Sequence, residues 1–176
     1  MRHAEGTHNA AAARDRALFM EKLFDSPTFW DAPLTPRGIE QCARLKTEID
    51  AVGPDVELIV VSPLTRTLQT GSLSFGAAYP SVRMLASESC RERIAVYTSE
   101  GRANLSELKK AWPKVDFSQL TSEQDPMFAD KEEDSVVAAR ALHFMNWVMA
   151  LPERRIAVVT HSVFLQVRQL RDKGIY

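Results

Sequence analysis

Two short apolar runs in the chain have the pattern of β-strands that are buried on both faces. They are Leu58-Ile59-Val60-Val61 and Arg155-Ile156-Ala157-Val158-Val159, and both are rich in β-branched residues. Such runs are typical of parallel strands with helices on either side. A third strand is expected at 82–85. The hydrophobic pattern therefore predicts a sheet with buried parallel strands.

The segments between these runs show the period of amphipathic helices, with apolar residues three or four positions apart. Helices are predicted at 10–24, 35–52, 65–75, 106–112, 135–151 and 163–173. Strands that alternate with helices favour helices on both faces of one sheet. We therefore predict an α/β fold, a three-layer α/β/α sandwich with a mostly parallel sheet.

Several helix boundaries are marked by capping residues. Thr35 is a typical N-cap, Pro36 suits the first helical position, and Gly53-Pro54 ends the helix. At 135–151, either Asp134 or Ser135 is expected to be the N-cap. The residues expected on the buried face of 35–52 are Ile39, Cys42, Leu45, Ile49 and Val52.

Composition narrows the class of protein. A chain of 176 residues fits one domain, and its formal net charge of −1 indicates neither nucleic acid nor an anionic membrane as a partner. Cys42 and Cys90 have no metal-ligand spacing and are expected to be reduced. No stretch approaches the roughly 20 apolar residues of a membrane-spanning helix, nor does the N-terminus resemble a signal peptide. We therefore expect a cytoplasmic protein.

The first nine residues contain a candidate nucleophile beside a cation. A neutral imidazole such as His3 can attack a phosphoryl group, and the planar guanidinium of Arg2 can hold two phosphate oxygens. Gly6 lets the backbone approach a ligand closely, and Asn9 offers amide donors at the start of the following helix. Alone, an Arg-His pair near a terminus is more often a solvated pair.

Two further candidates stand where predicted strands end. Arg66, in Ser62-Pro63-Leu64-Thr65-Arg66, lies in the first turn of a helix just after the strand 58–61, and His161 directly follows the strand 155–159. Ligands of open α/β sheets bind at the carboxyl ends of the strands. We expect both side chains to meet His3 there.

With Cys90-Arg91-Glu92-Arg93 and Val158-Val159-Thr160-His161-Ser162 added in order, the chain resembles the histidine phosphatase superfamily, which contains cofactor-dependent phosphoglycerate mutases and many acid phosphatases. Its opening is similar to mutase-like phosphatases that read Arg-His-Ala-Glu-Gly-x-His-Asn. The resemblance covers nearly the whole chain. It implies a phosphoglycerate mutase-like fold and one domain, 1–176, with a lid-like insertion around 97–134.

The resemblance also implies roles for individual residues. His3 is the expected nucleophile, His161 binds the transferring phosphoryl group, and Glu92 protonates the leaving oxygen, with Glu88 as the rival position. Phosphoryl oxygens are then held by Arg2, Asn9, Arg66 and the backbone N–H of Ser162.

Three further expectations concern the insertion around 97–134 and His143. Arg102 is expected as a further substrate contact. The acidic run 116–134 is expected to be solvated, and near an anion site it would repel the substrate. His143 is interpreted as an ordinary helix residue.

The resulting hypothesis is a phosphomonoesterase that acts on a small phosphorylated metabolite through a phosphohistidine intermediate. We expect no metal or other cofactor, since arginines and histidines neutralise the phosphate. Two alternatives remain open: a mutase, which returns the phosphoryl group to the substrate, and a non-catalytic phosphate-binding pseudoenzyme. The resemblance also implies a strand before His3 and another after the last helix, so we expect truncation at both termini.

Overall fold

The computed structural model describes residues 1–17, 26–53, 55–76, 79–95 and 97–166. It contains one four-stranded sheet in the order β3-β2-β1-β4, and all neighbouring strands are parallel. The strands are β1 (Leu58–Val61), β2 (Arg83–Ala86), β3 (Val115–Asp116) and β4 (Ile156–Val159). The predicted parallel sheet is confirmed.

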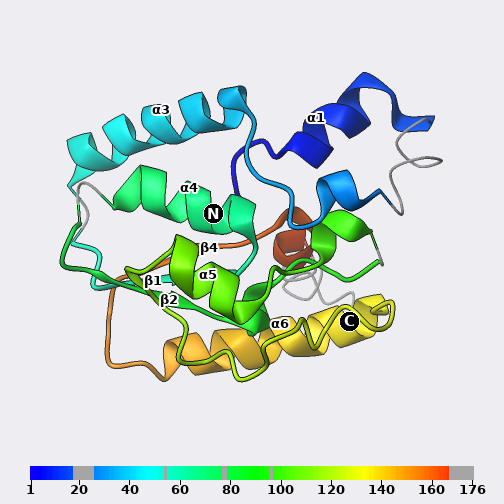
Figure 1. Ribbon diagram of the computed structural model, residues 1–176. Coiled ribbons are helices and arrows are strands. Elements are labelled where there is room, and N and C mark those ends of the chain that lie inside the picture. The colour runs from blue at the N-terminus through cyan, green and yellow to red at the C-terminus, as the bar shows by residue number, and fades with distance from the viewer. Residues whose placement is uncertain (18–25, 54, 77–78, 96, 167–176) are drawn as a thin grey trace.

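Helices cover both faces of the sheet. The α-helices are α1 (Thr7–Arg14), α3 (Pro36–Val52), α4 (Thr65–Phe75), α5 (Leu105–Ala111) and α6 (Asp134–Met149). Single 3-10 turns are η1 (Pro27–Phe29), η2 (Glu88–Cys90) and η3 (Thr98–Glu100). In Figure 1, α3 and α4 lie on one side of the sheet and α6 on the other. The predicted three layers are therefore present. Among the described residues, no helix has the length and apolar character needed to cross a membrane.

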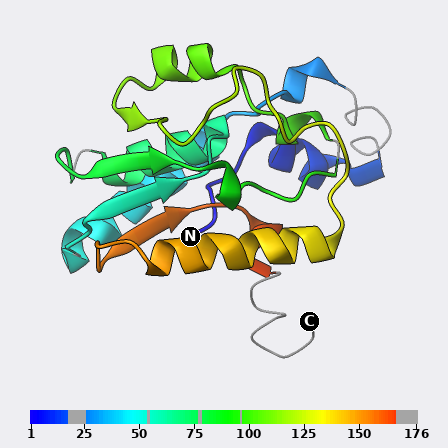
Figure 2. The ribbon, with the colours of Figure 1, turned by 90° about the horizontal axis from the view of Figure 1, so that it is seen from below.

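The strand β1 divides the core into two parts because successive side chains point to opposite faces of a sheet. Ile59 and Val61 enter the core that α4 covers. Leu58 and Val60 enter the core that α6 covers. Figure 2 shows α6 running along its face of the sheet. Both faces of β1 are buried, which is why its sequence is a continuous apolar run.

The predicted elements agree with the structure where the local signal was strong. In α3, the Thr35 hydroxyl accepts a hydrogen bond from Gly38 N at 2.9 Å, and Gly53 ends the helix with φ +58°. However, Ile39 is 46% exposed and Val52 79% exposed, so the expectation that they are buried was wrong. They lie in the first and last turns, beyond the reach of the core.

Other boundaries differ from the prediction. The N-cap of α6 is Glu133, which makes no side-chain capping bond, whereas Asp134 pairs with Arg93 at 2.8 Å. The predicted Asp134 or Ser135 cap was therefore wrong. The helix expected at 10–24 begins earlier, at Thr7, and ends at Arg14, because Asp15 is extended; the expected continuous helix was therefore wrong, and positions 18–24 lie outside the described residues. The same holds for 167–173 of the last predicted helix. The two-residue strand β3 is too short to give a periodic signal.

The first three residues continue the sheet beside β4. His3 N donates to Thr160 O at 2.9 Å, and Thr160 N donates to Met1 O at 2.9 Å. Arg2 and Thr160 form a parallel bridge. This pairing places His3 at the carboxyl end of the parallel strands. The expectation of truncation stays a prediction.

Candidate active site

A cleft of about 190 Å³ opens at this end of the sheet. Its lining includes Arg2, His3, Asn9, Arg66, Glu92 and Ser162, all of which the sequence predicted. The remaining predicted residue, His161, is fully buried beside the cleft, with its ring centroid 5.0 Å from that of His3. The structure therefore brings the seven predicted residues together.

His3 has the protonation state of a nucleophile. Its Nδ1 lies 2.6 Å from the carbonyl oxygen of Ala4, which can only accept, so Nδ1 carries the proton and Nε2 keeps its lone pair. Burial, and then the charge of Arg66, lower the pKa of His3 to about 3. The ring is neutral at neutral pH, as nucleophilic attack requires.

His161 is a second neutral imidazole. Its Nε2 lies 2.9 Å from the hydroxyl oxygen of Ser62, and among the described residues its Nδ1 has no hydrogen-bond partner. Burial lowers the pKa of His161 well below its usual value, and the neighbouring Arg66 and His3 contribute. The ring can therefore donate or accept a hydrogen bond without adding charge.

Arg66 is the buried cation of the site. It is 2% exposed, and its Nη1 donates to the carbonyl oxygen of Ser99 at 2.6 Å. Burial lowers the pKa of Arg66 to about 10, so the guanidinium stays charged at neutral pH. A cation held from behind by a backbone oxygen and facing a cleft is suited to an anionic ligand.

Hydrogen-bond donors surround this cation. The side-chain oxygen of Asn9 accepts from Gly6 N at 3.1 Å, which leaves the Asn9 amide N–H groups for a ligand. Arg2 is exposed beside them. Ser162 begins the helix at 162–166 and lines the same cleft.

Glu92 lines the cleft and also caps the helix at 162–166. Its Oε1 accepts from Phe164 N at 3.1 Å, and its Oε2 accepts from the Ser162 hydroxyl and from Val163 N, both at 3.3 Å. These contacts hold its carboxylate next to His161. Glu92 therefore lies in the cleft, as the sequence predicted, and its role as a helix cap is an additional finding.

Comparison with known proteins places this geometry in a family. The family model described as histidine phosphatase superfamily (branch 1) matches residues 27–170. The chain belongs to the histidine phosphatase superfamily.

Relatives of this chain include curated proteins and solved structures. A phosphoglycerate mutase-like protein from Arabidopsis thaliana is 31% identical over 195 residues, which cover 94% of this chain and 70% of the relative. A probable phosphatase from Schizosaccharomyces pombe is 27% identical over 160 residues, 81% of this chain and 68% of the relative. The structure of Bacillus stearothermophilus YhfR shares the fold, with a TM-score of 0.62 at 21% identity over 98% of this chain and 77% of YhfR.

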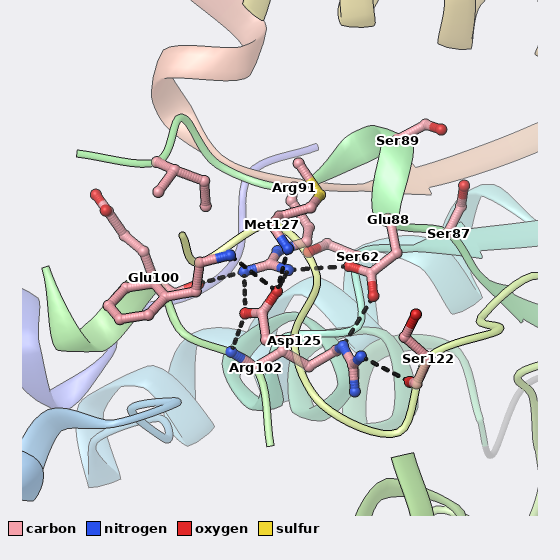
Figure 3. A network of polar contacts seen from close by, with 12 residues as sticks. Ser62, Ser87, Glu88, Ser89, Arg91, Glu100, Arg102, Ser122, Asp125 and Met127 are labelled. Carbon is pink, nitrogen blue, oxygen red and sulfur yellow. Dashed lines mark hydrogen bonds and ion pairs between the residues drawn. The ribbon is translucent and has the colours of Figure 1, made fainter. Parts of the chain in front are cut away.

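Two residues that the sequence offered for the site, Arg102 as a substrate contact and Glu88 as the rival proton donor, do not line the cleft. Figure 3 shows Glu88 directed at Arg102, and the ion pair joins Arg102 Nε and Glu88 Oε1 at 2.8 Å. Arg102 is 1% exposed and donates to the carbonyl oxygens of Ser122 and Gln124 at 3.1 and 2.9 Å. Arg102 is therefore a buried structural residue and not a substrate contact. Glu88 is occupied by cations outside the cleft and is no candidate proton donor.

The acidic run 116–134 is solvated only in part: Glu123, Asp130, Glu133 and Asp134 are exposed as expected, whereas Asp125 and Glu132 are held by cations. Asp125 forms a bidentate pair with Arg91, at 2.6 and 2.7 Å, and accepts from Arg102 N at 2.8 Å (Figure 3). Burial opposes ionisation of Asp125, but the bonds from Arg91 hold its pKa below its usual value. Glu132 pairs with Arg140 at 2.7 Å. The cations that pair with Asp125 and Glu132 come from other parts of the sequence, and no residue of 116–134 lines the cleft.

Several residues of the cleft were not predicted from the sequence, and two of them, His8 and Glu100, are titratable groups close to the predicted site. His8 lies between Gly6 and Asn9 of the opening motif, so its place in that motif was an available signal. Glu100 had no such signal. Its Oε2 accepts from Ala95 N and Tyr97 N at 2.6 and 3.1 Å, and burial raises the pKa of Glu100 to about 7.

Proposed function

We propose that the protein is a phosphomonoesterase that transfers a phosphoryl group to His3 and then to water. The observation that carries this proposal is the fixed tautomer of His3. Its Nδ1 is held by Ala4 O at 2.6 Å, so the lone pair is on Nε2, in a cleft that also contains the buried guanidinium of Arg66. A neutral nucleophile beside a fixed cation suits a dianionic phosphate ester.

In the proposed first step, His3 Nε2 attacks phosphorus while the bond from phosphorus to the ester oxygen breaks. The charge on the phosphoryl oxygens is met by Arg66 and Arg2, together with donors from Asn9, His161 and the Ser162 backbone. Glu92, which enters this step as the protonated carboxylic acid, gives its proton to the departing oxygen, and that oxygen leaves as an alcohol.

In the second step, water attacks phosphorus and the bond to His3 breaks. Glu92 takes the proton from the water, and inorganic phosphate leaves. His3 returns to its neutral form with Nδ1 still bonded to Ala4 O. The cycle consumes one ester and one water and yields one alcohol and one phosphate.

The substrate in this proposal is a small phosphorylated metabolite. Similar solved structures include a protein named ecdysone phosphate phosphatase from Bombix mori, in complex with tungstate, with a TM-score of 0.62 at 14% identity over 99% of this chain and 76% of that one. Another is a phosphoserine phosphatase from Entamoeba histolytica in complex with 3-phosphoglyceric acid. The cleft of about 190 Å³ suits a phosphoryl group with a small organic part.

A mutase is the second candidate, because the relatives from Arabidopsis thaliana are named mutase-like. Purified protein incubated with a panel of phosphate esters and with 3-phosphoglycerate separates the two. The proposal expects free phosphate from at least one ester. An isomerised phosphoglycerate without free phosphate would replace the phosphatase with a mutase.

A non-catalytic phosphate-binding protein is the third candidate. Alkaline quenching during turnover of a ³²P-labelled ester tests it, since phosphohistidine is stable in alkali and is lost when a matched sample is treated with acid. We expect label that is stable in alkali, absent in His3→Ala and retained in His143→Ala, whose histidine is exposed on α6. No label in the unmodified protein would favour the binding role.

A further inference from the structure

His8 is a cleft residue that the proposed mechanism does not use. It lies in the first turn of α1, and its ring centroid is 6.0 Å from that of His3, with the two planes tilted by 44°. Its side chain lines the same cleft as Arg66 and Asn9. An imidazole this close to the nucleophile is within reach of any group that the nucleophile attacks.

The ring of His8 is seated against the backbone of Gly6. A Cβ at position 6 would lie 2.7 Å from His8 Cε1 and 2.8 Å from His8 Nδ1, closer than side-chain carbons normally approach. Glycine therefore permits this placement of the ring. Because the Nδ1 edge packs on Gly6, Nε2 is the nitrogen that is left to face the cleft.

The surroundings of Nδ1 decide which nitrogen carries the proton. His8 Nδ1 is buried and, within the described part of the chain, has no hydrogen-bond partner. A buried N–H without a partner costs about 1–3 kcal/mol and is rarer than an unpaired acceptor. The favoured tautomer thus has its proton on Nε2. Burial, and then the charge of Arg66, lower the pKa of His8 to about 2, so the ring is neutral.

We propose that His8 donates a hydrogen bond from Nε2 to an oxygen of the phosphoryl group that His3 attacks. In a near-attack geometry, phosphorus lies about 3–3.5 Å from the nucleophilic nitrogen. A ring 6.0 Å from that of His3 can then reach an equatorial oxygen. Charge gathers on these oxygens during transfer, so a fixed donor there stabilises the transition state. The inference rests on the proposed function of the same cleft.

The direct test replaces the ring with groups of known hydrogen-bonding capacity. His8→Phe keeps an aromatic ring without the N–H, whereas His8→Gln keeps an amide donor. We expect His8→Phe to weaken binding of inorganic phosphate by roughly 10–100-fold and to lower kcat/KM for every ester by about 100-fold. His8→Gln is expected to recover part of both losses, and His143→Phe is the matched control on an exposed histidine. Wild-type phosphate affinity in a folded His8→Phe protein would overturn the proposal.

A double-mutant cycle tests the placement by Gly6. Gly6→Ala forces the His8 ring to move, so it is expected to weaken phosphate binding about as much as His8→Ala does. In the His8→Ala background the space is already open, so Gly6→Ala is expected to add little. Losses that simply add would contradict the proposed placement of the ring.

Binding of inorganic phosphate needs no turnover, which keeps this inference separate from the proposed function. If His8→Phe loses phosphate affinity but the unmodified protein hydrolyses no ester, only the proposed phosphatase function is contradicted. Hydrolysis by the unmodified protein, with unchanged phosphate affinity in His8→Phe, would contradict only the role of His8.

Discussion

The rings of His3 and His161 lie with their centroids 5.0 Å apart and their planes at 59°, although the two residues come from opposite ends of the described chain. The cause is the parallel pairing of Arg2 with Thr160, the residue before each histidine. Because both residues leave the sheet at the same edge, their side chains share one buried space. Burial keeps both imidazoles neutral, so one can attack while the other acts as a hydrogen-bonding group.

Replacing His161 by alanine is expected to impair turnover strongly. The change removes a neutral hydrogen-bonding group beside His3, and loss of one such group near developing charge costs about 10²–10³-fold in kcat. Ser62→Ala removes only the group that lies 2.9 Å from His161 Nε2, and a smaller loss is expected. Steady-state kinetics on one phosphate ester measure both. Equal activity of His161→Ala and the unmodified protein would show that this ring has no part in the chemistry.

Arg66→Lys is expected to lower kcat/KM by about 100-fold while the protein stays folded. Lysine keeps the charge but cannot bond Ser99 O and two phosphate oxygens with one planar group. Arg37→Lys is the matched control, because the side chain of Arg37 is 72% exposed. Activity assays with circular dichroism of each variant distinguish a lost contact from a lost fold. Full activity in Arg66→Lys would contradict the bidentate role.

The ion pair between Arg91 and Asp125 is expected to stabilise the attachment of the insertion. Arg91→Met leaves the Asp125 carboxylate buried without its cation, which typically costs about 3–5 kcal/mol of unfolding free energy. The double variant Arg91→Met/Asp125→Leu is expected to be more stable than Arg91→Met alone. Urea unfolding measures these differences.

The matched control for this pair is the exposed pair of Lys46 and Asp50 on α3. Lys46→Met is expected to change stability by less than about 0.5 kcal/mol, since exposed pairs contribute little. Similar losses from the buried and the exposed pair would contradict the prediction.

The stability difference between Glu100→Gln and the unmodified protein is expected to depend on pH. Burial raises the pKa of Glu100 from 4.5 to about 7, with Glu92 adding to the shift and Arg66 opposing it. Between these values the folded protein binds more protons than the unfolded chain, so the unmodified protein loses stability relative to the variant as pH rises. The expected slope is about 1.4 kcal/mol per pH unit.

Above about pH 7 this difference is expected to become constant, because Glu100 is then ionised in both states. The glutamine oxygen can still accept from Ala95 N and Tyr97 N, so the substitution removes the charge and keeps the bonds. Contributions from the histidines are common to both proteins and cancel. Urea unfolding from pH 4.5 to 8 measures the stability difference between the two proteins. A difference that does not change with pH would show that burial does not raise the pKa of Glu100.

Much of the fold was predictable from local sequence. The run Leu58–Val61 is apolar at every position because both faces of β1 are covered, and a strand of this kind can be recognised from four residues. The helix α3 begins and ends as predicted because Thr35 and Gly53 satisfy its terminal groups locally. Ile39 was misjudged, since helical spacing gives the direction of a side chain but not whether anything packs against it.

The candidate site was only partly predictable, and the difference lies in how far each residue's partner is along the chain. Arg66 and His161 follow apolar runs, so the rule that parallel strands present their carboxyl ends at one edge was enough to place them together. The roles of Arg102 and Asp125 depend on partners in other segments, and only packing determines which charges meet. Composition makes 116–134 look solvated throughout, because the cations that hold Asp125 and Glu132 lie outside this run.

The sequence by itself determined most helices and three of the strands along the chain, the family, and seven of the residues that gather at the sheet edge, because period, capping and short motifs act over a few residues. The tertiary structure alone decided which titratable groups are buried. Burial of His8 and of Glu100 in one cleft follows from contacts between distant segments. Since protonation depends on solvent access and nearby charge, the chemistry of the cleft becomes defined only when the chain is folded.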